Sequence, residues 1–345
     1  MPRTETVTIP YVVGRVFTHI GRIWRPRAAA IVLTMLTASA LGAGEVRFTI
    51  SNPGPLSVVT VVRVSLPVPE GLIAGEAPAE ALVGGKAVPV QARAITRHGD
   101  GSLRRVMLSV PVELPAQGAV DGVYPAGESD EAARPAGEQP PASISTDRWQ
   151  VVSGMDRIEL RGPGDALLAA VEPYGPETGQ ADPTVEVLDR GPQFVWLRYR
   201  REGDEWGREC DVRVFRTGEV RLTHRLQAKL DGDHWAPDVG WALTAPGARA
   251  PRAPGGPAHL LGRDPNSRFG DEANADLLAE ITLRDGRRIC AANPLALRQN
   301  RGTFQVSQTP EAVVLRSNRN EPVDDLETEG LMIQEGAWRF SELVI

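Results

Sequence analysis

The sequence contains few of the residues that usually mark a specific chemistry. Of its 345 residues, two are cysteines, two are lysines and 5% are aromatic. No GxSxG, P-loop or HExxH motif occurs, so the common signatures of serine hydrolases, nucleoside triphosphatases and zinc proteases are missing. Long uncharged runs are scarce, which excludes a multispan membrane protein. Because 41% of the residues are hydrophobic and 24% are charged, the composition also excludes an intrinsically disordered chain.

Glycine and proline, in contrast, are abundant, with 35 and 29 residues. Both residue types break helices, so their number disfavours a helical bundle and favours short strands joined by turns. A chain of this length also has room for two domains, each with its own core.

The first 40 residues have the pattern of an export signal. Three arginines between residues 22 and 27 form a basic stretch, an uncharged run follows over residues 28–44, and residues 38–40 read ASA. This order predicts a secretory signal peptide over residues 1–40. It therefore predicts an exported protein, periplasmic or extracellular, with no membrane segment once the signal is removed. An uncleaved membrane anchor and a buried helix are the alternatives.

Export would change the charge balance of the protein. The whole chain has a formal charge of −6, and residues 1–40 carry five arginines and one glutamate, a net +4, so the remainder carries −10. Binding to nucleic acid depends on Lys and Arg groups that release counterions from the phosphates. We therefore expect no nucleic-acid partner, and a polyanion could bind only at a local basic groove.

Cys210 and Cys290 are the two cysteines. An oxidising compartment would allow them to form one disulfide, but we expect two buried free thiols. No Cys/His spacing suits zinc, so the cysteines predict no metal site.

Alternating apolar and polar residues form a first block over residues 45–125. The predicted strands cover residues 46–50, 58–68, 87–95 and 103–114, and a Gly-Asp-Gly-Ser turn precedes the last of them. This spacing is typical of a small barrel or sandwich. Residues 115–142 are rich in Ala, Gly and Pro and contain few large apolar side chains, so we expect a linker or a long loop there.

The second block covers residues 143–345 and is richer in strand-like runs. Period-two alternation with short loops predicts antiparallel sheets, and this many strands predict two large sheets packed face to face. The predicted fold class is thus all-β, a small N-terminal β domain followed by a larger antiparallel β-sandwich, with one short helix over residues 268–278. The predicted strands are 149–153, 157–161, 184–189, 193–200, 209–216, 219–230, 279–284, 287–291, 312–317 and 330–334.

Short motifs in a fixed order resemble a known family. Residues 65–72 read SLPVPEGL, residues 88–93 read VPVQAR and residues 100–104 read DGSLR. Together they resemble the N-terminal RIFT-barrel domain of the YetA-like and exo-rhamnogalacturonan lyase (PcRGLX) family. The resemblance continues through the sandwich of that family, on the motifs at 187–192 (VLDRGP), 220–226, 238–241 (DVGW) and 335–338 (EGAW).

This resemblance implies a RIFT barrel, a β-sandwich and a polysaccharide or oligosaccharide ligand. The family's lyases cleave rhamnogalacturonan by β-elimination, and their machinery is thought to involve an α/α toroid that follows the β domains. No run of amphipathic helices occurs here, so no catalytic residue is carried over. We expect an exported, carbohydrate-associated protein that binds glycan or is accessory to a lyase. An active or truncated polysaccharide lyase is one alternative, and an envelope module that binds a protein through its sheet edges is the other.

A β-eliminating site needs a base, a cation that neutralises the uronate carboxylate, and a proton donor. His224, with Arg221 and Arg225 on the same predicted strand, is one candidate catalytic group. His234, within the sequence DGDHW, is the other. A histidine satisfied within the sheet and an ordinary surface turn are the alternative interpretations.

Four tryptophans, Trp196, Trp206, Trp235 and Trp241, are candidate sugar-stacking residues because pyranose faces pack on indole rings. Packing in the core of a sandwich is the alternative for each. The loop around His234 and the acidic residues within 264–272 carry oxygen atoms suited to calcium, but their spacing matches no EF-hand loop. We therefore expect no metal and no other cofactor, with calcium left open.

Overall fold

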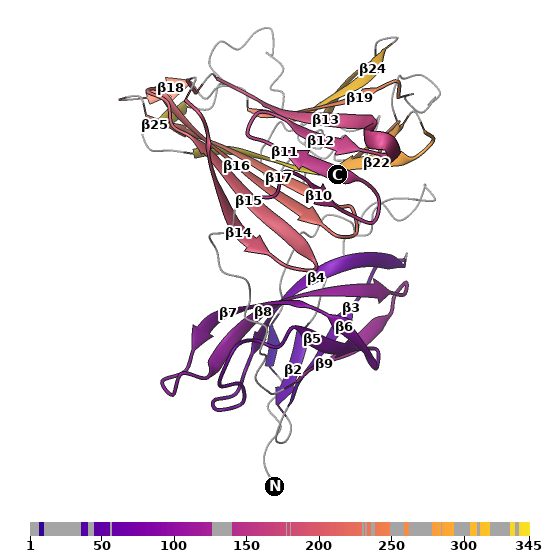
Figure 1. The fold of residues 1–345 in the computed structure, drawn as a ribbon, viewed down its shortest axis with the longest axis vertical. Helices are drawn as coiled ribbons and strands as arrows, with labels where there is room; N and C mark the ends of the chain where they lie inside the picture. The colour runs from indigo at the N-terminus through magenta and orange to yellow at the C-terminus, as the bar shows by residue number, and fades with distance from the viewer. Residues whose placement is uncertain are drawn as a thin grey trace. The chain divides into compact units, whose positions relative to one another are not determined.

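The structure is a computed structural model, and nearly all of its regular elements are β-strands (Figure 1). Within the part of the chain that it describes, the one helical element is a 3-10 turn at Pro163–Asp165. This confirms the predicted all-β fold class. No helix among the described residues has the length and apolar character needed to cross a membrane. Described are residues 7–9, 36–40, 45–55, 57–125, 140–176, 178–179, 181–229, 231, 233–235, 239–248, 259–261, 278–283, 285–292, 304–308, 311–317, 332–334 and 338–345.

The chain divides into two compact units. The first comprises Met1–Pro135 together with Gly191–Phe194, and the second comprises Ala136–Arg190 together with Val195–Ile345. Strand β9 (Ala119–Pro125) occupies part of the segment predicted as a linker. Tyr124 of this strand is fully buried, but the small and acidic residues that precede it do not form a clear apolar alternation, so the strand was not predicted. Residues 126–139 of that predicted linker lie outside the described residues.

The first unit contains two antiparallel sheets around one apolar core, which includes Phe48, Leu66, Leu108 and Tyr124. The six-stranded sheet has the order β1-β2-β3-β9-β5-β6, and the three-stranded sheet has the order β4-β8-β7. The specific identification as a RIFT barrel stays a prediction. The strands besides β9 are β1 (Val7–Ile9), β2 (Leu36–Ala40), β3 (Glu45–Ser51), β4 (Val58–Pro67), β5 (Glu80–Val83), β6 (Lys86–Pro89), β7 (Gln91–Arg97) and β8 (Leu103–Leu114).

Three of the four strands predicted here occur, and the fourth is divided. The run predicted over residues 87–95 becomes β6 and β7, since β6 ends at Pro89, which has no amide proton for a sheet ladder. The next amide, that of Val90, donates instead to the Ala79 carbonyl at 2.7 Å. Strands β1 and β2 come from residues 1–40, where the signal peptide stays a prediction.

The family-like motifs of the first unit bond to one another. The Ser102 hydroxyl donates to Asp100 Oδ1 at 2.6 Å and accepts the Gly71 amide at 2.9 Å. Gly71 has φ = +74°, a left-handed conformation that favours glycine. His98 Nε2 lies 2.9 Å from the Val68 carbonyl. The DGS turn therefore fastens the preceding Pro-x-Pro-x-Gly segment, and its residues have a structural explanation.

The second unit is a sandwich whose two large sheets share one apolar core. The seven-stranded sheet has the order β10-β11-β12-β13-β19-β24-β23, and the eight-stranded sheet has the order β14-β15-β16-β17-β26-β22-β21-β20. The strands are β10 (Ile144–Ser145), β11 (Gln150–Ser153), β12 (Ile158–Arg161), β13 (Leu167–Tyr174), β14 (Thr184–Arg190), β15 (Phe194–Arg201), β16 (Trp206–Phe215), β17 (Val220–Ala228), β18 (Asp233–Trp235), β19 (Gly240–Pro246), β20 (His259–Leu261), β21 (Leu278–Thr282), β22 (Arg288–Ala292), β23 (Phe304–Gln308), β24 (Ala312–Ser317), β25 (Met332–Gln334) and β26 (Trp338–Val344).

Two other expectations concern this unit. The helix predicted over residues 268–278 lies outside the described residues, except that Leu278 begins strand β21. Cys210 is a buried free thiol, whereas Cys290 is exposed. The expectation of two buried thiols is therefore wrong for Cys290, which occupies an outward position on β22.

Candidate functional site

Charged side chains gather on the outer face of strands β15, β16 and β17. Alternation along each strand explains why: Leu197, Val212 and Leu222 turn into the core, and their neighbours turn away from it. We call the outward set the arginine–carboxylate face. Its members are Trp196, Arg198, Arg200, Glu209, Asp211, Arg213, Arg221 and Arg225.

The centre of this face is the carboxylate of Asp211, which is 1% exposed. Arg198 binds it in a bidentate manner, with Nε 2.7 Å from Oδ1 and Nη2 3.0 Å from Oδ2. Arg225 Nη2 lies 3.1 Å from the same Oδ2. The hydrogen bond that Arg198 donates to Asp211 raises the pKa of its guanidinium above its usual value. Two arginines are thus fixed around one buried acid.

Glu209 extends the network along β16. Arg200 Nε donates to Glu209 Oε2 at 2.8 Å, and Arg225 Nη1 donates to Oε1. Arg198 Nε is a further 3.4 Å neighbour of Oε1. Three guanidinium groups therefore surround two carboxylates, and Glu186, opposite Arg198 on β14, is a further acid beside them.

Trp196 lies beside this network. The guanidinium carbon of Arg213 is 4.0 Å from the centre of the indole, and that of Arg198 is 6.0 Å away. These distances allow cation–π attraction. One side of the half-buried ring is therefore covered by Arg213, so a sugar could use only what remains exposed of the indole.

Of the two arginines predicted to lie beside His224, one joins the network around Asp211 and the other does not. Arg225 is part of the network, whereas Arg221 pairs with Glu219 and stacks on Phe215 at 4.9 Å. Arg221 is therefore engaged by its own neighbours.

His224 points into the core, on the opposite side of β17 from both arginines. It is 0% exposed and meets Trp241 edge to face, with 5.7 Å between the ring centres. Burial and the positive charge of Arg208 together lower its pKa to about 3, and a backbone hydrogen bond involving Gly240 opposes the shift. Neither ring nitrogen makes a hydrogen bond of ordinary geometry. The hypothesis of a base with an arginine neutraliser beside it is therefore wrong, because period-two alternation separates them.

The tryptophans do not form a common platform. Trp241 is fully buried in the sandwich core, and Trp206 packs with Leu226, Ala228 and Val239. Neither presents a ring face to a sugar, since both faces contact protein.

The second candidate histidine lies on the short strand β18, where His234 pairs with Ile333 of β25. The side chains of His234 and Trp235 are outside the described residues, as are residues 264–272. Among the residues described, no group of three or more His, Cys, Asp or Glu side chains is arranged to hold a metal ion.

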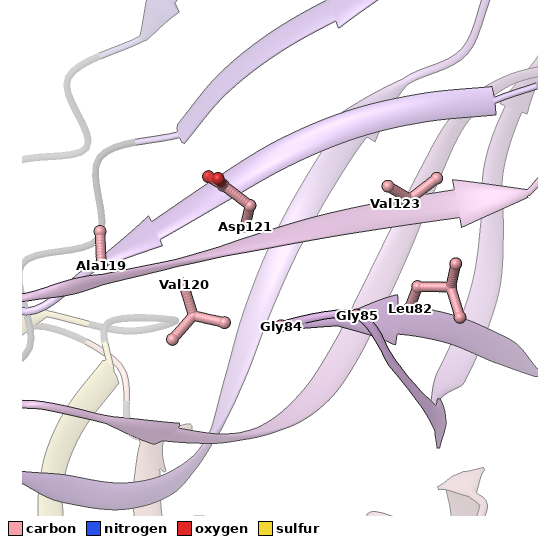
Figure 2. A pocket seen from close by; sticks show the side chains of 7 residues that line it. All are labelled: Leu82, Gly84, Gly85, Ala119, Val120, Asp121 and Val123. Atoms are coloured by element: carbon pink, nitrogen blue, oxygen red, sulfur yellow. The ribbon is translucent and has the colours of Figure 1, made fainter.

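The first unit has an open hollow of about 430 Å³ over β5 and β9. Figure 2 shows Ala119, Asp121 and Val123 on one side of β9 and Val120 on the other. The single charged group among its lining residues, Asp121, accepts a hydrogen bond from the Thr49 hydroxyl at 2.8 Å. With no basic or aromatic side chain in its lining, this hollow offers little for recognition of a sugar.

Comparisons with known proteins assign no family. No family model matches the sequence, and no curated protein matches it. Similar solved structures include an alpha-mannosidase from Enterococcus faecalis V583, at a TM-score of 0.48 and 11% identity over 88% of this chain and 43% of that one. They also include a glycosyl hydrolase family 38 protein from Enterococcus faecalis, at 0.45 and 10% over 88% and 44%. The chain thus spans less than half of either structure, and these scores are too low to bear on its fold or function.

Proposed function

We propose that the protein is an exported, carbohydrate-associated protein that binds an acidic glycan on the arginine–carboxylate face. The observation that carries this proposal is that buried carboxylates hold Arg200 and Arg225 on the same outer face where Arg213 stacks on the half-buried indole of Trp196. This combination supplies both fixed polar donors and an apolar ring.

The network prepares the arginines for binding. Each guanidinium has five N–H groups, and the carboxylates accept only some of them. Because Glu209 and Asp211 already fix the side chains, a ligand would lose less conformational entropy in ordering them. Arg200 remains 47% exposed. A uronate carboxylate fits the fork of a guanidinium, which favours acidic over neutral sugars.

The same geometry supports binding without cleavage. Glu209 and Asp211 accept hydrogen bonds from arginines, so neither is poised to take a proton from a substrate. His224 lies in the core, beyond the reach of a ligand on this face. Neither the two central carboxylates nor His224 is therefore placed to act as a base on this face.

Titration calorimetry with rhamnogalacturonan and with a neutral galactan tests the proposal. We expect the intact protein to bind the acidic glycan, and Arg200→Gln with Trp196→Ala to weaken binding by about tenfold or more. The matched control is Arg157→Gln: Arg157 is 46% exposed and forms ion pairs with Glu159 of β12 and Glu172 of β13, in the other large sheet. Equal affinity of the double variant and the control would refute the assignment to this face.

Ultraviolet absorbance of the same mixtures tests the lyase alternative. A β-elimination product contains a 4,5-unsaturated uronate, which absorbs. We expect a flat trace over hours, and a rising trace from the folded protein would replace the binding proposal with an active lyase.

A further inference from the structure

The first unit carries a second basic surface, on strands β7 and β8. Arg93 pairs with Met107, and Thr96 pairs with Arg105, so these side chains share one face of the three-stranded sheet. A register shift between Ala94 and Thr96 places Ile95 as the extra residue of a β-bulge. We call Arg93, Ile95, Arg105 and Met107 the β7–β8 patch.

The arginines of this patch differ from most others because no acid pairs with them among the described residues. Arg47 and Arg97 in the same unit form ion pairs, as do Arg198, Arg200 and Arg225 in the other. Among the residues that the structure describes, Arg93, Arg104 and Arg105 are exposed and form neither an ion pair nor a side-chain hydrogen bond.

Among the described residues, no acid forms an ion pair with the patch. Glu76 pairs with Arg97, and Asp100 accepts from Ser102, a hydrogen bond that lowers the pKa of Asp100 and keeps it charged. Glu70 is exposed near the Arg104 end of β8 without an ion pair among the described residues. Glu113 lies opposite Val59, several residues along β8. Two arginines without an ion pair among the described residues therefore share one side of the sheet, within a chain whose net charge is −6.

An apolar surface accompanies the charge. Ile95 is 46% exposed, one of the few large apolar side chains with that exposure among the described residues, and Met107 beside Arg93 is half-buried. Strand β7 is also an edge strand, so its outer side is not covered by a neighbouring strand of its sheet. Cations next to an exposed apolar side chain match a polymer of carboxylated sugar rings, which has acidic groups and apolar ring faces.

We propose that the β7–β8 patch is a docking surface for a carboxylated polysaccharide. It shares no residue with the arginine–carboxylate face and does not depend on a ligand there. Charge complementarity selects this occupant, since an acidic chain otherwise repels a polyanion and the patch is a local exception. The contacts are exposed, so binding weakens as salt screens them.

The experiment compares polygalacturonate with its fully methyl-esterified form, which has the same sugar backbone without the charge. The full chain is titrated with both at low and at physiological salt. We expect binding of polygalacturonate that falls with salt, and a loss of about tenfold in Arg93→Gln/Arg105→Gln. Lys86→Gln is the matched control, an exposed cation on β6 of the same unit without an ion pair among the described residues, and it should change affinity less than about twofold.

Several outcomes would overturn the proposal. Unchanged polygalacturonate affinity in the double variant would remove the patch as a site. Equal binding of the methyl-esterified polymer would show that charge does not select the ligand. If the double variant loses as much affinity for single-stranded DNA of the same number of charges as it loses for polygalacturonate, the patch is a general polyanion surface. The two sites remain distinguishable, because loss in Arg200→Gln alone implicates the second unit and loss in Arg93→Gln/Arg105→Gln alone implicates the first.

Discussion

The two units bury different kinds of polar group. In the described residues of the first unit, the buried polar side chains are neutral, as in Asn52, Gln91 and Ser102. The second unit buries Arg208, Glu209, Asp211 and His224. A core with ionisable groups depends on their protonation and pairing, whereas a core with neutral polar groups does not. The second unit should therefore be the pH-sensitive one.

The surface arginines of the two units also differ. Most described arginines of the second unit form ion pairs with acids, so removal of such an acid changes the stability of the unit as well as its surface charge. The side chains of Arg93 and Arg105 in the first unit form no ion pair or hydrogen bond among the described residues. Variants of the first unit's cations thus report on ligand binding more directly than variants in the network do.

The largest expected effect is loss of stability of the second unit in acid. The pKa of His224 is about 3 in the folded protein and 6.5 in the reference state. Because the folded value is the lower one, the unfolded chain binds the proton first, and stability is complete above pH 6.5 and falls as the pH decreases toward 3. The expected loss is about 1.4 kcal/mol per pH unit, or ~5 kcal/mol over the interval. Six of the seven tryptophans belong to this unit, so tryptophan fluorescence in urea measures it.

The control for this prediction is His224→Leu, which keeps an apolar side chain beside Trp241. Between pH 6.5 and about 4.5, where most carboxylates stay ionised, the variant should lose the slope. If it keeps the wild-type slope, another group is responsible, and the contrast between the two cores would not rest on His224.

The second effect in size is that of Asp211→Ala. Removal of this buried carboxylate leaves Arg198 and Arg225 without their central acid, and we expect a loss of about 3 kcal/mol in the free energy of unfolding. The comparison variant is Asp147→Ala, since Asp147 is 61% exposed and pairs with Arg216. It should cost less than about 0.5 kcal/mol in the same urea titration. Equal costs would mean that the network is ordinary surface charge.

Alternation in the sequence was enough to predict much of this fold. Strand β17 has a period-two pattern that the structure reproduces, because one of its sides meets the core. Strand β16 was also predicted, although it is buried along nearly its whole length because arginines cover its outward carboxylates. Strand β13 was not predicted, since LLAAVEPY begins with a continuous apolar run that has no period of two. Strand β19 was also missed because its pattern contains small residues and ends at Pro246.

The site was less predictable than the fold. Alternation placed Trp196, Arg198 and Arg200 on one polar side of a strand, as observed. The acids that hold these arginines lie on the next strand of the sheet, and period-two patterns do not specify the register between strands. Trp241 shows the same limit, since its neighbours Gly240 and Ala242 do not reveal which side of β19 faces the core.

The smallest effect concerns the first unit and separates the two cores. Tyr124 is fully buried, and its hydroxyl donates to the Pro78 carbonyl at 2.8 Å. Tyr124→Phe keeps the ring and removes the donor, so we expect the free energy of unfolding of the first unit to fall by about 1 kcal/mol. In a urea titration, far-ultraviolet circular dichroism should show part of the unfolding at a lower urea concentration. The tryptophan fluorescence transition should keep its midpoint, because six of the seven tryptophans belong to the second unit. A matching shift of both signals would mean that the units unfold as one, and that the contrast between their cores does not extend to separate stabilities.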